Sequence, residues 1–230
     1  MNFIKEKIKK SEGKLWFWSK NFIYEWIKMT EYLDYYDIDW NYLWKDTREN
    51  IHSKWLWHNT VHCWLYTTDG KIIFQIRADT HTLYTTASWH VLAGETIKQA
   101  FSREIKEELW IDLDTSDAEL VSIVEWKQDK IKSDWSEYHD RANAHVYVNL
   151  YQWNFSDFNF DPNELEGVAV VDATETLELF KNWSWKINAT IVKNDEIIER
   201  LIDITDFLVT QNETYLWKYG DILEKAISLC

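Results

Sequence analysis

Three glutamates in the stretch from Arg103 to Trp110 could hold a metal ion. Apolar residues recur at spacings of three and four between Ile97 and Leu109, which predicts an amphipathic helix. On that helix Glu107 and Glu108 each lie about one turn from Glu104, so the three carboxylates share a face, where like charges destabilise an isolated helix. A hard divalent cation such as Mg²⁺ reverses this effect, because it binds carboxylate and phosphate oxygens. The alternative interpretation is a solvated acidic helix face.

The residues around these glutamates resemble the Nudix box, G-x5-E-x7-R-E-U-x-E-E-x-G-U, where U is a bulky aliphatic residue. Most of the constrained positions match the pattern: Glu95, Arg103, Glu104, Ile105, Glu107, Glu108 and Ile111. The two mismatches, where the pattern has glycine, are Trp89 and Trp110. The run of matched residue types at fixed spacing favours the metal site over the solvated face.

The resemblance implies an α+β fold, the Nudix α/β/α sandwich with a mixed sheet. It also implies a Mg²⁺-dependent pyrophosphohydrolase, with Mn²⁺ as an alternative ion, that cleaves a nucleoside diphosphate linked to another moiety or a related diphosphate. In such a box Glu104, Glu107 and Glu108 bind the metal, helped by the backbone carbonyl of residue 89. Arg103 orients the carboxylates, while Glu95 and residue 110 support the box. Nudix proteins are often dimeric, so the resemblance adds a homodimer to the expected partners.

Residues upstream of the box, from Thr47 to Trp64, are similar to the N-terminal region of Nudix proteins related to isopentenyl-diphosphate isomerase. That isomerase has a further metal site built from histidines and downstream glutamates. The residues at or near the matching places are His52, His58, His90 and Glu137, and His139 stands where a second glutamate would. These five residues are therefore additional candidates for metal or substrate contacts. Hydrogen-bonded histidines with no such role are the alternative.

Two departures favour hydrolysis over isomerisation. The isomerase has a cysteine just before its glycine-histidine pair, where this chain has Ser88, and it usually degrades the R-E-x-x-E-E run that is intact here. An isomerase of allylic diphosphates is therefore the second hypothesis. The third is an inactive Nudix domain that binds a nucleotide as a sensor, which native tryptophans at positions 89 and 110 would favour.

The surrounding pattern predicts a mixed α+β domain. Hairpins are expected around residues 39–41 and around Asp69-Gly70, the second with a type I′ turn. Thr96 and Gln99 form a capping box that starts the helix. Strands are predicted at 118–126, 144–153 and 168–172, and a helix at 173–182. Two amphipathic helices are predicted in the tail, at 196–209 and 220–229.

These elements predict one Nudix domain over residues 29–182, a helical C-terminal extension at 183–230, and an N-terminal extension at 1–28 whose status depends on whether Met29 is the true start. The net charge of -14 disfavours a nucleic-acid platform or an anionic membrane surface. No apolar run reaches the length of a membrane span. Two cysteines without metal spacing fit a reducing cytoplasm, and a small-molecule diphosphate is the expected partner.

Tryptophan and glycine have unusual abundances, with 16 Trp beside 5 Gly. Several tryptophans lie in polar clusters typical of turns, where a positive φ often requires glycine: Trp40, Trp135, Trp183 and Trp185. Trp110 directly follows the predicted helix, where a left-handed glycine is a common cap. We hypothesise that many of these positions are glycine codons, plausibly UGA, that this translation renders as Trp. A naturally Trp-rich protein is the alternative.

Overall fold

The computed structural model describes residues 31–109, 111, 113–131, 137–152, 158, 160, 164–183, 185–193, 196–208 and 213–230. The strands are β1 (Tyr32–Tyr36), β2 (Tyr42–Thr47), β3 (Trp57–Tyr66), β4 (Lys71–Arg77), β5 (Leu83–Tyr84), β6 (Ala87–His90), β7 (Glu119–Ile131), β8 (Glu137–Leu150), β9 (Leu165–Asp172), β10 (Ile187–Lys193) and β11 (Glu196–Ile202). The helices are α3 (Arg48–Ser53), α4 (Ile97–Glu108), α5 (Ala173–Lys181), the short 3-10 helix η3 (Ile204–Asp206) and α6 (Glu213–Leu229). The predicted 1–28 extension, Trp110 and Trp135 lie outside the described residues.

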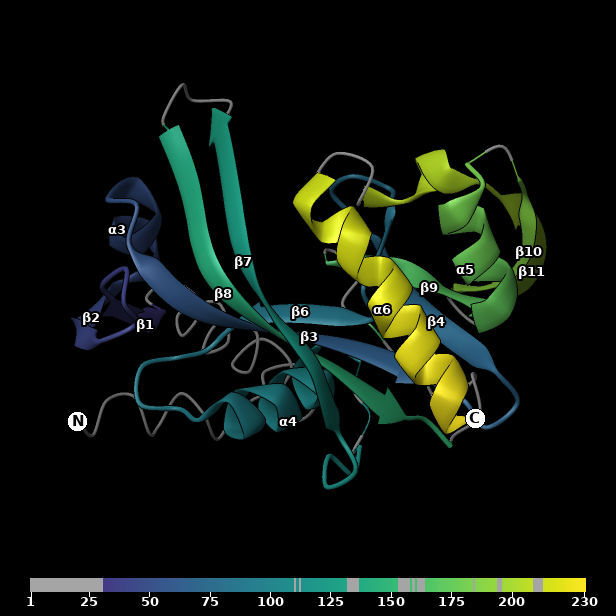
Figure 1. Ribbon diagram of the computed structural model, residues 1–230, viewed down its shortest axis with the longest axis horizontal. Helices are drawn as coiled ribbons and strands as arrows, with labels where there is room; N and C mark the ends of the chain where they lie inside the picture. Colours follow the sequence, from purple (N-terminus) through teal and green to yellow (C-terminus); the bar gives the residue numbers. More distant parts are fainter. Residues whose placement is uncertain are drawn as a thin grey trace, which may run out of the picture.

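The strands form one mixed sheet with β3 at its centre (Figure 1). The main strand order is β11-β10-β9-β4-β3-β1-β2. One edge of β3 is shared by three partners, β1, β6 and β4, which pair with successive parts of it. The other edge pairs in parallel with β8, which in turn pairs with β7. Three strands and the long β7–β8 hairpin therefore meet at β3, and residues on β3 are held from both sides.

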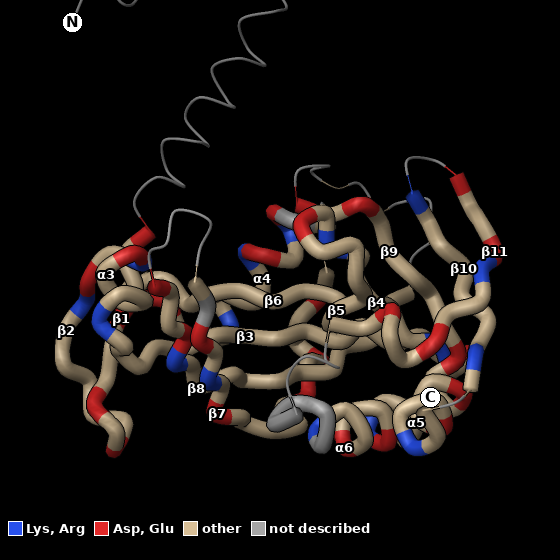
Figure 2. Tube along the Cα trace, turned by 90° about the horizontal axis from the view of Figure 1, so that it is seen from above, with Lys and Arg blue, Asp and Glu red and all other residues tan. Residues whose placement is uncertain are grey.

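Helices cover both faces of the sheet, as Figure 2 shows in side view. Successive side chains of a strand point to opposite faces, and β3 supplies both cores. Val61, Cys63 and Leu65 join the apolar core beneath α4. Trp64 joins the second core, which is completed by α5 and α6. The chain is thus an α+β protein with the expected α/β/α sandwich and a C-terminal helix.

The expected hairpins are present, with one change of turn type. β1 and β2 pair around the turn that contains Trp40. At the second hairpin Gly70 has φ +79°, but it is the only residue of that turn with a positive φ. A type I′ turn needs two such residues, so the prediction was wrong. The Gly70 N–H instead donates to Thr67 O at 3.1 Å, closing a turn in which only Gly70 is left-handed.

The tail differs from the expectation of two helices. Residues 196–202 form the strand β11 rather than a helix, and β10 and β11 extend the sheet beyond β9. The apolar residues of Glu196–Ile202 lie at 197, 198, 201 and 202, a spacing typical of a helix, and pairing with β10 overrides that local pattern. A boundary at residue 182 therefore falls inside the sheet. The second predicted tail helix is α6, which begins at Glu213 and packs on α5.

Within the described part of the chain, no helix is both long and apolar enough to cross a membrane.

Candidate functional site

Helix α4 presents the predicted metal-binding face, and its start is fixed by local hydrogen bonds. The Thr96 side chain accepts a hydrogen bond from Gln99 N, and the Gln99 side chain accepts one from Thr96 N. This confirms the capping box, and the helix ends with Leu109 as its C-cap. Its apolar side, with Ala100, Phe101 and Ile105, is buried in the core under β3 and β6. Burial of that side leaves the charged residues of α4 on the opposite side.

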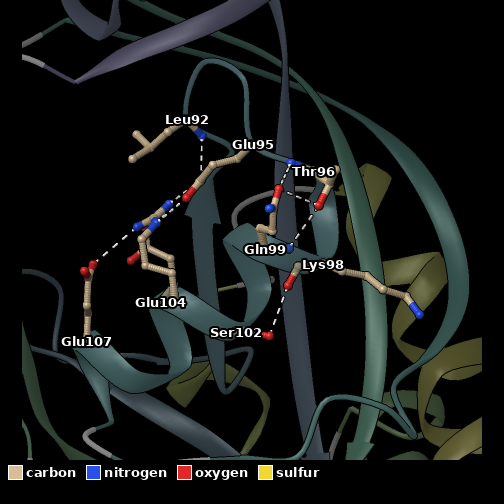
Figure 3. Close-up of polar contacts among 9 residues, drawn as sticks. Leu92, Glu95, Thr96, Lys98, Gln99, Ser102, Glu104 and Glu107 are labelled. Atoms are coloured by element: carbon tan, nitrogen blue, oxygen red, sulfur yellow. Dashed lines mark hydrogen bonds and ion pairs between the residues drawn. The ribbon is translucent and has the colours of Figure 1, made fainter.

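Arg103 is the centre of a carboxylate network at that helix. Its partners Glu95, Glu104 and Glu107 are labelled in Figure 3. Its Nε and Nη2 donate to the two oxygens of Glu95 at 2.7 and 2.8 Å, a bidentate pair. Its Nη1 forms an ion pair with Glu104 and a longer one with Glu107 at 3.3 Å. One guanidinium therefore serves three carboxylates, and the cluster keeps an excess of negative charge.

The pKa values in this network follow from burial and from that guanidinium. Burial raises the pKa of Glu104 to about 7, although the Arg103 charge opposes the shift. Burial also acts on Glu95, but there the Arg103 hydrogen bonds and charge outweigh it and lower the pKa. For Arg103 burial is outweighed by the hydrogen bonds that it donates to Glu95 and by the charge of Glu104, so its pKa is raised. Glu104 is consequently the carboxylate that lacks sufficient positive charge nearby.

The loop before α4 is held by strand β1. Gly94, with φ +82°, donates its N–H to Asp34 Oδ2 at 2.8 Å. The neighbouring Ala93 N–H donates to Tyr32 O at 2.8 Å, and Leu92 N donates to Glu95 Oε2 at 3.1 Å. The loop thus connects β1 to Glu95, and through Glu95 to Arg103. Sequence reasoning missed Asp34, whose only signal was its place in a strand ahead of the box.

Three box positions are either in a different arrangement from the one that the pattern suggested or are not described. Trp89 lies in β6 rather than in a loop, paired with Val61, and its indole is buried in the core beneath α4. The Glu108 side chain and residue Trp110 lie outside the described part of the chain. Their roles stay predictions.

Three of the predicted histidines meet on the other face of the sheet. His52 comes from α3, His58 from β3 and His90 from β6, and their ligand atoms all lie within 4.8 Å of one another. His90 Nε2 is 3.3 Å from His52 Nε2. His58 has the same parity as Trp64 on β3, so it faces away from α4. The cluster is therefore a second centre, joined to the box by the loop that follows His90.

Burial keeps His58 and His90 neutral. It lowers the pKa of His58 to about 4 and that of His90 well below its usual range. The His58 side chain is fully buried, and its Nε2 has no hydrogen-bond partner among the described residues. Neutral, buried imidazole nitrogens that point at one another are the donors that transition metals bind.

Asp140 and Tyr138, rather than Glu137 and His139, complete this cluster. Asp140 Oδ1 lies 3.5 Å from His58 Nε2 and 4.0 Å from His52 Nε2. The Tyr138 hydroxyl is 3.0 Å from His52 Nε2. Alternation along β8 puts 138 and 140 on one face and 137 and 139 on the other.

Glu137 and His139 pair with each other at 3.2 Å on the opposite face of β8. His139 also contacts Asp129 at 2.8 Å and stacks on Trp55. The two residues were thus wrongly grouped with the histidine cluster. Alternate residues of a strand lie on the same face. This rule, applied to the sequence of β8, would have selected Asp140.

Two tryptophans occupy backbone conformations that favour glycine. Trp40 has φ 62° in the β1–β2 turn, and Trp55 has φ 61° just after α3. The Leu56 N–H donates to Ile51 O at 3.0 Å, so Trp55 fills the left-handed position of a Schellman cap, where glycine is usual. Trp183 and Trp185 lie in an exposed turn as predicted, but neither has a positive φ.

Comparisons with known proteins agree with this geometry. A NUDIX domain model matches residues 56–191, more than half of the chain. An uncharacterised Nudix hydrolase of Clostridium acetobutylicum is 27% identical over 165 residues, which cover 66% of this chain and 75% of that protein.

Solved structures with a similar fold were also found. The DR0079 protein of Deinococcus radiodurans is 19% identical, with a TM-score of 0.47 over 64% of this chain and 87% of that one. The dihydroneopterin triphosphate pyrophosphohydrolase of E. coli is 20% identical, with a TM-score of 0.36 over 54% of this chain and 87% of that one.

In this chain a mixed sheet lies between helices, and the carboxylate-bearing helix α4 follows a glycine-containing loop. The chain belongs to the NUDIX domain family. It is a Nudix hydrolase, a class of enzyme that acts on phosphoric anhydride bonds. The comparisons give no support to the narrower isomerase-related subgroup.

Proposed function

We propose that the chain is a Mg²⁺-dependent pyrophosphohydrolase that cleaves a nucleoside diphosphate linked to another moiety, or a related diphosphate. The carrying observation is the Arg103 network, in which a largely buried Glu104 shares one guanidinium with Glu95 and Glu107. Carboxylate oxygens are the ligands that Mg²⁺ prefers, and the excess negative charge is what a divalent ion would neutralise. The donor set therefore fits Mg²⁺, and it also accepts Mn²⁺.

In this proposal each residue has a distinct task. Glu104, Glu107 and Glu108 would hold the ion, with the carbonyl of Trp89 as a further candidate ligand. When bound, the ion polarises the phosphoryl group and lowers the pKa of the attacking water. Arg103 fixes the rotamers of Glu104 and Glu107 through charge-assisted hydrogen bonds. Glu95 holds Arg103 in the required orientation and ties it to the loop at Leu92.

Glu104→Gln tests the box directly. The change keeps the shape of the side chain but removes its charge, so product release from a diphosphate substrate should fall by at least about 10²-fold. Glu125→Gln, on the exposed side of β7, is the matched control and should keep full activity. Unchanged turnover in Glu104→Gln at saturating Mg²⁺ would rule out the proposed role. A screen of diphosphate esters with and without Mg²⁺ identifies the substrate.

We further propose that His52, His58 and His90 bind a second metal ion, with Asp140 beside them. The convergence of ring nitrogens from two buried histidines and one half-buried histidine supports this role. Metal content after loading with Zn²⁺ or Mn²⁺ and dialysis should show one ion in the wild type that His58→Asn loses and the exposed-site control His81→Asn retains. An equal metal content in wild type and His58→Asn would contradict the site.

The same assays separate the remaining alternatives. An isomerised allylic diphosphate without phosphate release would favour the isomerase, and nucleotide binding without turnover would favour the sensor. We also propose a cytoplasmic location, supported by two free cysteines, Cys63 and Cys230.

A further inference from the structure

The strand β11 forms an edge of the sheet with an unusual share of exposed aliphatic residues. Figure 2 shows it as the outermost strand, and within the described part of the chain it pairs only with β10. Ile197 is 65% exposed, Ile198 47% and Leu201 60%. An edge strand carries a row of backbone donors and acceptors, and proteins usually protect such an edge with charges or proline. Here only Glu196, Glu199 and Arg200 interrupt the aliphatic residues.

The spacing of those charges selects one way for two copies of β11 to pair. A two-fold axis perpendicular to the sheet relates antiparallel strands, and facing residues must point to the same side. The two-fold axis must therefore pass beside one residue of β11, and that residue faces the same residue of the second copy. A centre at Glu199 or at Arg200 would place like charges directly opposite each other, which is unfavourable.

A centre at Ile198 gives complementary neighbours. It places Ile198 against Ile198 of the second copy, and Glu196 against Arg200 of the second copy, twice by symmetry. A centre at Leu201 would instead oppose Glu199 to Asp203, again two like charges. Of these registers, only the one at Ile198 pairs Glu196 and Arg200 with opposite charges, while Glu199 faces Ile197 of the second copy.

We infer that β11 is a homodimer interface, in which two sheets join edge to edge with Ile198 on the two-fold axis. Each cross-strand pair contributes a few tenths to about 1 kcal/mol. Arg200 also forms an ion pair with Asp206 of the same copy. The interface contains no residue of the Arg103 network or the histidine cluster, so it is independent of the proposed catalytic function.

A cysteine at the proposed axis tests the register. In a Cys230→Ser background, Ile198→Cys should form a disulfide-linked dimer under mild oxidation. Leu201→Cys is the matched control, because it lies on the same strand with similar exposure but away from its symmetry mate. Equal cross-linking of the two variants, or none at Ile198→Cys, would overturn the proposal.

Charge exchange gives a second, non-covalent readout. Sedimentation over a range of concentrations should show a wild-type dimer whose dissociation constant rises about tenfold in Glu196→Arg. In an Asp206→Asn background, which removes the like charge that Arg200→Glu would otherwise meet, the double variant Glu196→Arg/Arg200→Glu should recover most of that loss, because both cross-strand pairs are restored with reversed signs. Glu196→Arg leaves the Arg200–Asp206 pair intact, and a thermal melt checks that it folds. A wild type that stays monomeric, or a double variant weaker than the single one, would refute this interface.

Discussion

Trp40 and Trp55 have positive φ angles, which are unfavourable for residues other than glycine. A non-glycine residue in the left-handed region costs roughly 1–2 kcal/mol. Both side chains regain some of that energy through ring contacts, Trp40 with Trp57 and Trp55 with His139. The backbone conformation at these two positions is the structural observation that bears most directly on the glycine-codon hypothesis. Trp89 differs, because it is a buried strand residue without a positive φ.

Comparison of glycine with alanine isolates the backbone effect from the lost ring contacts. At Trp40 and Trp55 the glycine variant should be more stable than the alanine variant by about 1 kcal/mol, since only glycine enters the left-handed region freely. At Trp44, an exposed strand residue, the order should reverse. Urea unfolding of the six variants measures this. Alanine equal to or better than glycine at both turn positions would remove the structural support for native glycine.

Mass spectrometry of the protein from its natural source tests the codon hypothesis itself. Each reassigned position lowers the intact mass by the difference between tryptophan and glycine. Peptide mapping should find glycine at positions 40 and 55. A mass that corresponds to 16 tryptophans would end the hypothesis.

His62 makes the stability depend on pH. It is buried on β3, and burial lowers its pKa to about 3. The unfolded chain binds a proton near pH 6.5, whereas the folded chain does so only near pH 3, so stability is lost as the pH falls through this window. Lowering the pH from 6.5 to 5 should cost up to ~2 kcal/mol from this residue. Unfolding free energies of wild type and His62→Asn across that range should converge at low pH, and parallel curves would contradict the assignment.

At the scale of elements, the connection from β1 to the box loop is the feature that the sequence pattern did not reveal. The box residues were predicted because their types and spacing are strict, and the capping box because it is local. Asp34 lies 60 residues before Gly94, and nothing in the sequence joins them. The β11 strand was missed for a related reason, since pairing with β10 decided its conformation and the local pattern did not.

Asp34→Ala should loosen the loop that carries Glu95 without touching the carboxylates. Small displacements of positioned groups reduce turnover strongly, and we expect kcat to fall about tenfold with a higher Mg²⁺ requirement. Asp34→Asn should recover most of the activity, because its amide oxygen can still accept from Gly94 N. Asp39→Ala, in the neighbouring turn, is the control. Loss of activity in the asparagine variant equal to that in alanine would show that the hydrogen bond is not what matters.

For the whole molecule, Mg²⁺ should act as a stabilising ligand. An ion that binds only the folded chain adds about 1.4 kcal/mol at ten times its Kd. The Tm should therefore rise with Mg²⁺ concentration, and the rise should be smaller in Glu104→Gln. An identical Tm in Mg²⁺ and in a chelator would argue against the site.

The sandwich, its helix and its carboxylates followed from the sequence, whereas the placement of side chains across strands did not. Residue 140 and residue 139 are neighbours in the chain, yet only Asp140 reaches the histidines. Faces of long strands depend on register, and register is set by pairing with distant segments.

The parallel pairing of β3 with β8 also has consequences for how the protein is made. It joins His58 to Ala142 and Tyr66 to Leu150, so every pair is more than eighty residues apart in the chain. Folding that depends on such distant contacts is slow. During synthesis β3 and α4 leave the ribosome long before β8 is made. Until then, the edge of β3 that pairs with β8 lacks its hydrogen-bonding partner. The nascent chain is most exposed to aggregation in that interval, while helix α4 is already complete.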